Sequence, residues 1–381
     1  MLTLFPLLLA MLEPGSALLI LRDGKPVQTK VEGAADIQSG RKITAKTNFR
    51  LASVTKQFTA TAILLLAKDG KLHIDDPVAK HLSPWPAYAN AVTIRHLLTH
   101  TSGLPDYDND VPDSTPQLTD ADVLAFVRKQ TAPLFPPGAK YQYSNTGYAI
   151  LALIVEHASS QSFPAFLKAR IFQPLGMKNT VAHVEGRDTV ANRAYGHSRA
   201  ATGWKRDDQS ATSAVLGDGG IYSNLLDLAK WVRALDKCTL LDCETLRQSW
   251  TSATLNDGTK TNYGFGWRLE TRDSRRVISH TGETRGFRNV LLRYPDQKIV
   301  VILLTNRNEG TPATVAATNE LRAEFLHFSN YWHFVEIANK EEEVEHFRMQ
   351  CDRYRIDAMK AATSRATRAI SPGTILTLMR W

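Results

Sequence analysis

Residues 49–59 read Phe-Arg-Leu-Ala-Ser-Val-Thr-Lys-Gln-Phe-Thr and open an apolar segment that continues to Lys68. Its apolar side chains recur every three or four residues, and Gly70 follows at a position suited to end a helix. Ser53 and Lys56 are separated by one helical turn, so their side chains share a face. The segment therefore predicts a helix that presents a serine and a lysine together in its first turn.

A serine and a lysine so placed have a specific chemical use. A serine hydroxyl is a weak nucleophile and needs a base within hydrogen-bond reach. A lysine in a dry cleft can act as that base, or can stay charged and lower the pKa of a neighbouring group. Backbone N–H groups at a helix start also favour developing negative charge. The same spacing recurs at Ser39 and Lys42, where Gly40 and polar neighbours indicate a loop, so the helical context favours Ser53.

The chain on both sides of this helix predicts β-strands. Before it, two runs between Ser16 and Val31 flank Asp23-Gly24, a pair typical of a hairpin turn. Late in the chain a meander of strands is predicted, followed by a helix that would pack back on the sheet. These late elements are strands at Arg276–Thr281, Phe287–Tyr294 and Lys298–Thr305 and a helix at Thr314–Phe328.

Residues 73–215 differ from both ends. They are rich in proline and loop signals, with helices predicted near 119–130 and 146–159. This pattern indicates a mostly helical subdomain inserted into the sheet. The expected fold class is α/β: an antiparallel sheet formed by both chain ends and flanked by helices, in a main domain spanning residues 13–330.

Composition excludes several classes of protein. The 381 residues are 43% hydrophobic and 22% charged, which excludes wholesale disorder. The net charge of +8 is spread thinly rather than gathered in one run, so no nucleic-acid partner is expected. No apolar run reaches the ~18 residues of a bilayer span.

The two ends of the chain carry separate expectations. Residues 1–12 are nearly all apolar and suit a secretory signal, although no basic residue precedes them. We expect a periplasmic or secreted protein; the alternative is a hydrophobic first helix in a cytoplasmic one. Residues 331–381 predict an amphipathic helix with a loose tail. That helix either lies on the body or supports self-association through residues 331–363.

The cysteines leave two possibilities open. Of Cys238, Cys243 and Cys351, the first two bracket a short segment that can close a small disulfide in an oxidising compartment. Two free structural thiols are the alternative.

Two further triplets could carry chemistry. Tyr143-Ser144-Asn145 precedes an apolar helix, where a tyrosine can point into a cleft and an asparagine can hold a substrate amide or the lysine side chain. The same pattern begins at Tyr88 and Tyr222, and periodicity alone does not choose between Tyr143 and Tyr222. His280-Thr281-Gly282 ends a predicted strand, whose edge offers backbone groups to an extended substrate.

A metal or cofactor is not expected. His96 and His100 are four residues apart and could share a helix face as metal ligands, but no third ligand is apparent. Structural histidines are the better interpretation. No phosphate loop or dinucleotide-binding glycine pattern occurs.

Taken together, the three elements in this order resemble the penicillin-recognising serine hydrolases: serine β-lactamases, DD-peptidases and related esterases. The resemblance runs from about residue 14 to 328 and includes the segment around Ser53, Leu-Leu-Thr-His-Thr-Ser-Gly-Leu at 97–104, and Gly-Gly-Ile-Tyr-Ser at 219–223. The two additional segments favour the class C-like branch. Because Tyr222 falls in the last of them, Tyr143 is left as the match to the family's active-site tyrosine.

The resemblance implies a β-lactamase/transpeptidase-like fold and a role for each matched residue. Ser53 would be acylated, with proton transfer shared by Lys56 and Tyr143. The substrate-binding residues would be Asn145, His280, Thr281 and Gly282, and the backbone N–H groups of Ser53 and Glu283 would form the oxyanion hole.

One departure from the family pattern bears on the substrate. Penicillin-specific members usually carry lysine where this chain has His280, whose ordinary pKa near 6.5 leaves it mostly neutral at pH 7. We therefore expect an esterase or D-amino-acid-type peptidase acting on a small molecule or short peptide. The alternatives are a β-lactamase, in which the arginines between 272 and 293 would compensate, and a catalytically silent binding protein on the same scaffold.

Overall fold

The described chain opens with a hairpin of two antiparallel strands, β1 (Ser16–Arg22) and β2 (Lys25–Glu32). Asp23 and Gly24 join them with φ angles of 50° and 71°, the two positive values that a type I′ turn requires. The Asp-Gly pair therefore produces the predicted hairpin. The computed structural model describes residues 13–308, apart from positions 110, 113, 185, 188 and 273.

The late strands complete one six-stranded antiparallel sheet. Its order is β10-β11-β12-β13-β1-β2, so the last described strand pairs with the first described strand, as predicted from both chain ends. In that pairing Ala17 lies opposite Leu304. The late strands are β10 (Arg268–Arg272), β11 (Arg275–Thr284), β12 (Phe287–Tyr294) and β13 (Ile299–Thr305).

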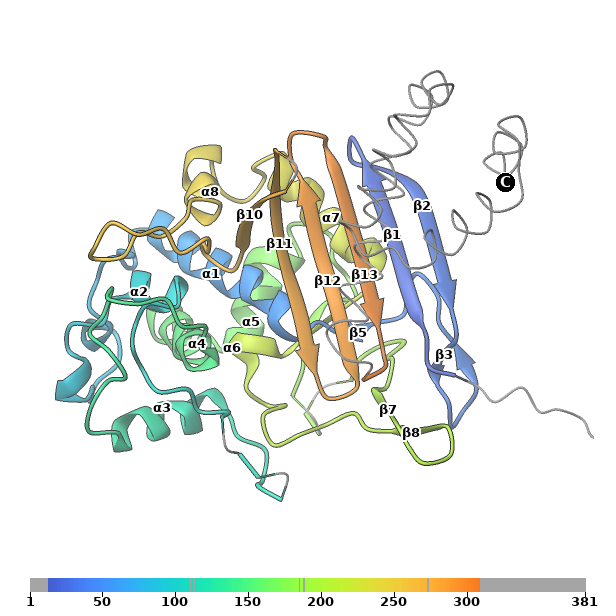
Figure 1. Cartoon of the computed structure of the whole chain (residues 1–381), viewed down its shortest axis with the longest axis horizontal. Helices are drawn as coiled ribbons and strands as arrows, with labels where there is room; N and C mark the ends of the chain where they lie inside the picture. The colour runs from blue at the N-terminus through green and yellow to red at the C-terminus, as the bar shows by residue number, and fades with distance from the viewer. Residues whose placement is uncertain are drawn as a thin grey trace, which may run out of the picture. The chain divides into compact units, whose positions relative to one another are not determined.

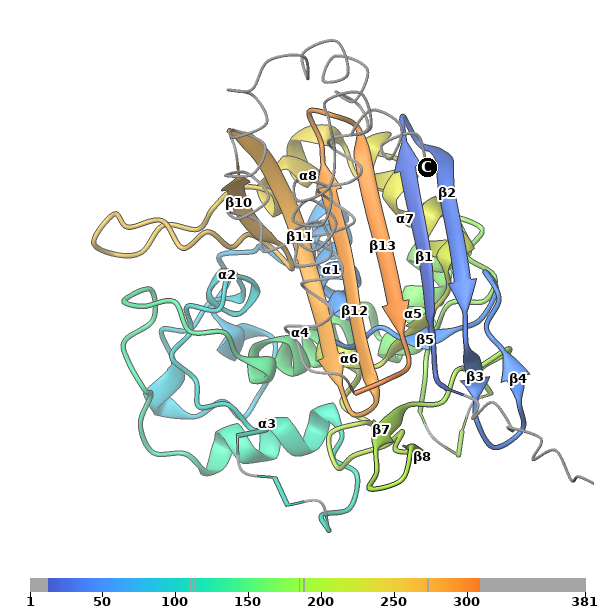
Figure 2. The same cartoon turned by 45° about the vertical axis from the view of Figure 1, so that its right-hand side comes forward.

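Two long helices lie on one face of this sheet, where α1 (Lys56–Lys68) and α7 (Leu225–Asp236) appear behind the strands in both views (Figures 1 and 2). Helix α7 packs on β1 and β13, and every residue of α1 from Lys56 to Leu66 is buried. Helix α1 is therefore part of the hydrophobic core of the described residues. A helix held in this way fixes the position of the turn that precedes it.

The predicted helical subdomain lies beside the sheet (Figure 1). Its two predicted helices are present as α3 (Asp120–Lys129) and α4 (Asn145–Ser159), and α4 packs against α1. The other helices are α2 (Ile94–Leu98), α5 (Phe163–Leu167), α6 (Leu216–Gly219) and α8 (Cys243–Ser249), with short helical turns η1 (Ala52–Thr55), η2 (Val78–Lys80), η3 (Ala87–Ala89) and η4 (Lys168–Phe172).

Short strands tie the loops together in three small sheets. They are β3 (Ala34–Asp36) with β4 (Arg41–Lys42), β5 (Phe49–Arg50) with β9 (Ile221–Ser223) and β6 (Val181–Ala182), and β7 (His197–Arg199) with β8 (Trp204–Arg206). The β5–β9 pair brings the segment before Ser53 beside residues 221–223.

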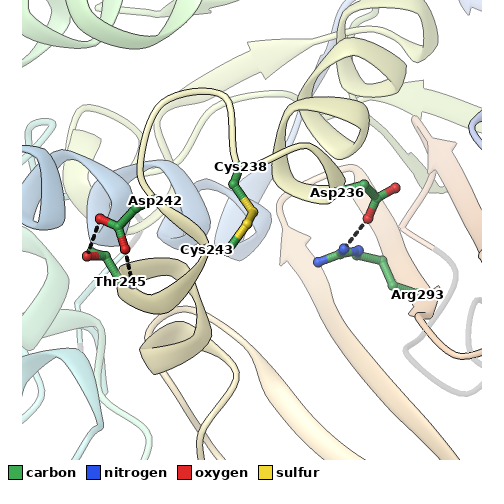
Figure 3. Close-up of a disulfide and its surroundings, with 6 residues drawn as sticks. All are labelled: Asp236, Cys238, Asp242, Cys243, Thr245 and Arg293. Atoms are coloured by element: carbon green, nitrogen blue, oxygen red, sulfur yellow. Dashed lines mark hydrogen bonds and ion pairs between the residues drawn. A yellow bond between two sulfur atoms is a disulfide. The ribbon is translucent and has the colours of Figure 1, made fainter.

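Cys238 and Cys243 form a disulfide between the end of α7 and the first residue of α8 (Figure 3), which decides between the two possibilities left open by the sequence. Within the described ranges, no helix has the length and apolar character needed to cross a membrane. Three expectations lie outside the described residues: the signal-like segment 1–12, the helix at 314–328 and the extension 331–381.

Candidate active site

The turn that carries Ser53 is built to expose one side chain. Strand β5 leads into η1, which leads directly into α1. From residue 47 to residue 66 every side chain is buried except that of Ser53. Ala52, immediately before it, has a φ of 49°, a left-handed conformation that costs free energy in a non-glycine residue and is typical of functional turns. The fold therefore presents the Ser53 hydroxyl alone at this point of an otherwise buried segment.

Lys56 lies directly behind that hydroxyl. Its side chain is 0% exposed, and its Nζ donates to Ser53 Oγ at 3.0 Å, to Asn145 Oδ1 at 2.6 Å and to the backbone oxygen of Asp218 at 3.0 Å. A buried amine is costly unless its hydrogens are satisfied, and an ammonium has three donors. The three acceptors thus fix the nitrogen beside Ser53, which the sequence predicted from the one-turn spacing.

Asn145 is fixed by two aspartates that the sequence analysis did not single out. Its Nδ2 donates to Asp108 Oδ2 at 2.6 Å, which turns Oδ1 toward Lys56. The Asp106 carboxylate accepts the backbone N–H groups of Asn145 at 3.1 Å and Thr146 at 2.9 Å, so it caps the start of α4. Burial, and then the nearby Asp106, raise the pKa of Asp108. Both polar ends of Asn145 are therefore engaged within the protein, and it holds the lysine side chain.

The third acceptor of Lys56, the Asp218 backbone oxygen, is held in place by hydrogen bonds among buried polar groups. Tyr107 donates its hydroxyl hydrogen to Asp218 Oδ2 at 2.8 Å, and burial raises the pKa of Asp218 to about 7. The carboxyl of Asp120, also raised to a pKa of about 7 by burial, accepts the backbone N–H groups of Leu216 and Gly217 at 3.0 Å each. These contacts fix α6, whose Asp218 carbonyl faces Lys56.

Tyr143 lies beside the Ser53–Lys56 pair. The Lys56 Nζ is 5.0 Å from the centroid of its ring, and the guanidinium carbon of Arg268 is 5.5 Å from the same centroid. The Tyr143 hydroxyl is buried and has no hydrogen-bond partner among residues 13–308 as described. Positive charge thus lies close to a phenol whose hydroxyl has no hydrogen-bond partner within the described chain.

The other two Tyr-x-Asn patterns lie elsewhere. Tyr88 donates to the backbone oxygen of Val127, and the Tyr222 hydroxyl accepts from Gln209 in a buried position on β9. Of the three tyrosines, Tyr143 is the one over whose ring Lys56 lies, in agreement with the choice made from the family resemblance.

His280 is buried rather than displayed on the strand edge. It is 1% exposed, its Nδ1 donates to the Thr281 backbone oxygen at 2.6 Å, and its Nε2 lies 2.9 Å from the Tyr263 hydroxyl. Since a carbonyl only accepts, Nδ1 carries the hydrogen and Tyr263 donates to Nε2. Burial, together with the charge of Lys56, lowers the pKa of His280 to about 3. The geometry differs from the expectation of a direct substrate contact, because both ring nitrogens are already used.

Gly282 allows two pieces of backbone to meet. A Cβ atom at this position would lie 2.0 Å from the backbone oxygen of Leu51, in the turn that carries Ser53. The lack of a side chain at Gly282 therefore lets β11 approach the turn that carries Ser53. Strand β10 begins at Arg268, opposite Ser279, so the part of the β11 edge that follows Ser279 and includes Glu283 has no strand partner on that side in the described chain. The edge that lies beside η1 is the one that would offer backbone groups to a substrate.

The two histidines considered as metal ligands serve the protein structure. His96 accepts the Thr93 N–H at 3.1 Å in a capping arrangement at the start of α2, and His100 Nδ1 accepts the Ser144 N–H at 3.1 Å. In the part of the chain that the structure describes, no three His, Cys, Asp or Glu side chains gather as metal ligands would.

Comparison with known proteins agrees with this architecture. A family profile named Beta-lactamase matches residues 8–325, more than four fifths of the chain. The chain belongs to the Beta-lactamase family. Family membership confirms the resemblance stated from the motifs and accounts for the antiparallel sheet with its inserted helices.

Relatives of this Beta-lactamase family protein include penicillin-binding protein 4* of Bacillus subtilis, 33% identical over 73% of this chain and 65% of that protein. A D-aminopeptidase of Brucella anthropi is 28% identical over 78% of this chain and 57% of that protein. The solved structure of an octameric penicillin-binding protein homologue from Pyrococcus abyssi has a TM-score of 0.69 and 27% identity, over 82% of this chain and 74% of that one. The chain thus spans about three fifths of the length of the two curated relatives.

Several residues around the site were missed by the sequence analysis. Asp106 and Asp108 follow the 97–104 segment directly, and Asp218 precedes the Gly219-Gly220 pair, so their closeness to family segments was an available signal. No local signal marks Arg268 or Tyr263, because neither belongs to a matched motif. The position of Arg268 beside Tyr143 depends on how β10 pairs with β11, and Tyr263 precedes β10 and reaches His280 across 17 residues of sequence.

Proposed function

We propose that this protein is a serine hydrolase that cleaves an ester or amide bond through an acyl-enzyme on Ser53. The observation that carries the proposal is the buried Lys56 Nζ, 3.0 Å from the one accessible side chain between residues 47 and 66. A nucleophile within hydrogen-bond reach of a fixed amine is the arrangement that this chemistry needs.

The proposed reaction has two acyl transfers. Ser53 Oγ forms a bond to the acyl carbon as its proton passes to Lys56 or Tyr143, and the bond to the departing alcohol or amine breaks as that group takes up a proton. Water then releases the acid. For Lys56 to accept the Ser53 proton, it must first lose one of its three hydrogens, the one donated to Ser53; the other two N–H bonds can then stay with Asn145 and Asp218, so no side chain has to move. The backbone N–H groups of Ser53 and Glu283 are the proposed donors to the oxyanion.

An ester or a D-amino-acid peptide is the proposed substrate class. The D-aminopeptidase relative supports the peptide, and the buried, neutral His280 argues for either substrate over a β-lactam, because it supplies no fixed cation. A β-lactamase and a silent binding protein are the alternatives that the experiment must separate. We also propose that the protein is exported, since the Cys238–Cys243 disulfide is stable in an oxidising compartment.

The test is hydrolysis of short-chain nitrophenyl esters by the wild type, Ser53→Ala and Ser39→Ala. Ser39 heads the other Ser-x-x-Lys pattern, and its hydroxyl donates to Asp36 in a turn, so its variant is a matched control. Activity is expected in the wild type and in Ser39→Ala but not in Ser53→Ala, with all three showing the same circular dichroism and melting temperature.

A second readout identifies the intermediate and the substrate. Rapid acid quenching followed by intact-mass measurement should show the wild type carrying the acyl group and Ser53→Ala unmodified. The rates of hydrolysis of D- and L-aminoacyl nitroanilides are then compared with that of a chromogenic cephalosporin, which distinguishes a peptidase from a β-lactamase. Equal ester hydrolysis by the wild type and Ser53→Ala, or none by either, would overturn the proposal in favour of a binding protein.

A further inference from the structure

A second cavity lies outside the candidate active site, between α2 and the loop that joins α8 to β10, two segments that lie side by side in both views (Figures 1 and 2). Its volume is about 380 Å³, within the range of small-molecule sites, about 300–1,000 Å³. None of Ser53, Lys56 and Tyr143 lines it. The proposed chemistry therefore leaves this cavity without a role.

Hydrogen-bonded backbone shapes the loop side of the cavity. Asn256 joins the loop to the turn at Gly138, because its backbone N–H donates to the Gly138 oxygen at 2.9 Å and its Nδ2 donates to the Pro137 oxygen at 3.0 Å. Within the loop, the N–H of Leu255 donates to the Thr259 oxygen at 2.8 Å. The cavity is therefore a feature of the fold and does not depend on the placement of a single side chain.

His96 on α2 presents a hydrogen-bond donor at this cavity. Its Nδ1 accepts the Thr93 N–H at 3.1 Å, and burial, followed by the charge of Arg95, lowers its pKa, so the ring is neutral at pH 7. A neutral imidazole with one accepting nitrogen carries its hydrogen on the other. The Nε2–H group makes no hydrogen bond within the described chain, and His96 lines the cavity.

The charged side chains at the cavity are all basic, since no Asp or Glu lines it. Lys260 is exposed and donates to Thr254 Oγ1 at 2.5 Å, and it forms no ion pair with a carboxylate of the described residues. Arg95 is already paired through its Nε and Nη2 with Asp75, which leaves its Nη1 hydrogens. A net positive charge therefore comes from Lys260, and the cavity favours an anion.

The hydroxyl groups at the cavity have the opposite polarity. Thr99 donates its hydroxyl hydrogen to the Arg95 backbone oxygen at 2.8 Å, and Thr251 donates to the Arg247 backbone oxygen at 2.8 Å. A hydroxyl whose hydrogen is used in this way still accepts through its oxygen. These threonines therefore suit a ligand that carries hydroxyl donors of its own.

We propose that this cavity binds a small hydroxylated phosphate ester, such as a sugar phosphate. A tetrahedral phosphate directs its oxygens several ways, so it can accept from donors on separate elements, here His96 on α2 and Lys260 in the loop. A planar carboxylate is best matched by one guanidinium, and that of Arg95 is held by Asp75. The inference stands apart from the proposed function, because it requires no reaction at Ser53.

The test is calorimetric titration at low ionic strength with glucose 6-phosphate, inorganic phosphate, glucose and glucuronate. The proteins are the wild type, Lys260→Met, His96→Glu and the control Lys205→Met, which removes an exposed lysine of β8. Glutamate at position 96 keeps the capping arrangement with Thr93, in which a Thr-x-x-Glu pattern is favourable, but replaces the Nε2–H donor with negative charge. Melting temperatures establish that each variant is folded.

Glucose 6-phosphate should bind the wild type and Lys205→Met equally and Lys260→Met about tenfold more weakly, because a charged hydrogen bond is lost. His96→Glu should not bind it, glucose should not bind any of the proteins, and added salt should weaken the wild-type complex. Absence of binding to the wild type, or equal affinities of Lys260→Met and Lys205→Met, would overturn the inference. Glucuronate binding as tight as that of glucose 6-phosphate would overturn the assignment of a phosphate.

A final titration separates this cavity from the candidate active site. Ser53→Ala should bind glucose 6-phosphate as the wild type does, with the same affinity in the presence of a saturating nitrophenyl ester, because Ser53 does not line the cavity. Competition between the ester and glucose 6-phosphate would place the probe at Ser53 and overturn the inference. Since no turnover is measured, a failure of the proposed function leaves this result unchanged.

Discussion

The imidazole of His100 lies against the ring of Tyr143, with the two centroids 4.3 Å apart. The same side chain accepts the backbone N–H of Ser144 at 3.1 Å, so it holds the Tyr143–Asn145 segment by stacking and by a hydrogen bond. His100 is itself buried and has a φ of 58°. A residue with this geometry sets where the Tyr143 hydroxyl points, although it does not touch Ser53.

We predict that His100→Ala lowers kcat for ester hydrolysis by about 10–100-fold with little change in KM, because Tyr143 is misplaced rather than removed. His100→Asn should keep more activity, since asparagine tolerates the left-handed backbone and its side-chain oxygen can still accept from Ser144. Steady-state kinetics with melting temperatures measure both effects. Identical kcat values for the two variants would contradict a positioning role.

The buried, neutral His280 predicts a pH-dependent stability. Its pKa is about 3 in the folded protein and about 6.5 when unfolded, so between those values the unfolded chain binds one more proton. Stability attributable to this residue is complete above pH 6.5 and is lost as the pH falls toward 3, at up to about 1.4 kcal/mol per pH unit. The raised pKa values of Asp120 and Asp218 change stability with pH in the opposite direction. The effect of His280 must therefore be measured as a difference in unfolding free energy between the wild type and a variant without the histidine.

Denaturant unfolding of the wild type and His280→Gln at pH 7, 6, 5 and 4 makes that comparison. The free-energy advantage of the wild type should shrink steadily below pH 6.5, because only the wild type carries the histidine. A difference that stays constant across this range would show that His280 accepts a proton in the folded state as readily as in the unfolded chain.

Local sequence signals were sufficient for much of the fold. The Asp23-Gly24 turn and the apolar run at 287–294 occur where the structure has a hairpin and β12. Strand β10 was not predicted, because Arg-Leu-Glu-Thr-Arg has a single apolar residue and only partial burial. Its strand character comes from pairing with β11 rather than from its own pattern.

The candidate site likewise combines residues that local sequence predicts with residues that it does not. Ser53, Lys56, Tyr143 and Asn145 come from short motifs that can be read along the chain, and the structure brings all four together. The partners that hold them come from segments far apart in sequence, since Asp108 lies in a turn before α3 and Asp218 in α6. Single-sequence periodicity has no information about such contacts, and the same limit explains why His280 was expected on the surface of the site.

The disulfide between Cys238 and Cys243 closes a short loop near the Asp236–Arg293 ion pair (Figure 3). Loop-closure entropy for a loop of this length predicts a contribution of about 2 kcal/mol to the free energy of unfolding. Replacing both cysteines by serine should lower that free energy by this amount, and dithiothreitol should lower that of the wild type equally. Cys351→Ser is the control, expected to respond to the reductant as the wild type does; a double variant as stable as the oxidised wild type would contradict the prediction.

Two glycines that contact the Ser53 turn should respond differently to alanine. At Gly282 a Cβ would lie 2.0 Å from the Leu51 backbone oxygen, so Gly282→Ala must move either β11 or the turn that carries Ser53. At Gly219 a Cβ would meet Ala52 at 3.5 Å, an ordinary van der Waals contact. We predict that Gly282→Ala loses most ester hydrolysis, by about 100-fold for a shift near 1 Å, while Gly219→Ala stays within a few-fold of the wild type.

Comparison of Gly282→Ala with Gly219→Ala separates displacement of Ser53 from a general loss of stability. Acylation rate and melting temperature are measured for both variants, and the rate in Gly282→Ala should fall well beyond what its unfolded fraction explains. Equal losses in the two variants would mean that any added methyl group near the turn is harmful. A fully active Gly282→Ala would mean that the contact between β11 and the turn does not set the position of Ser53.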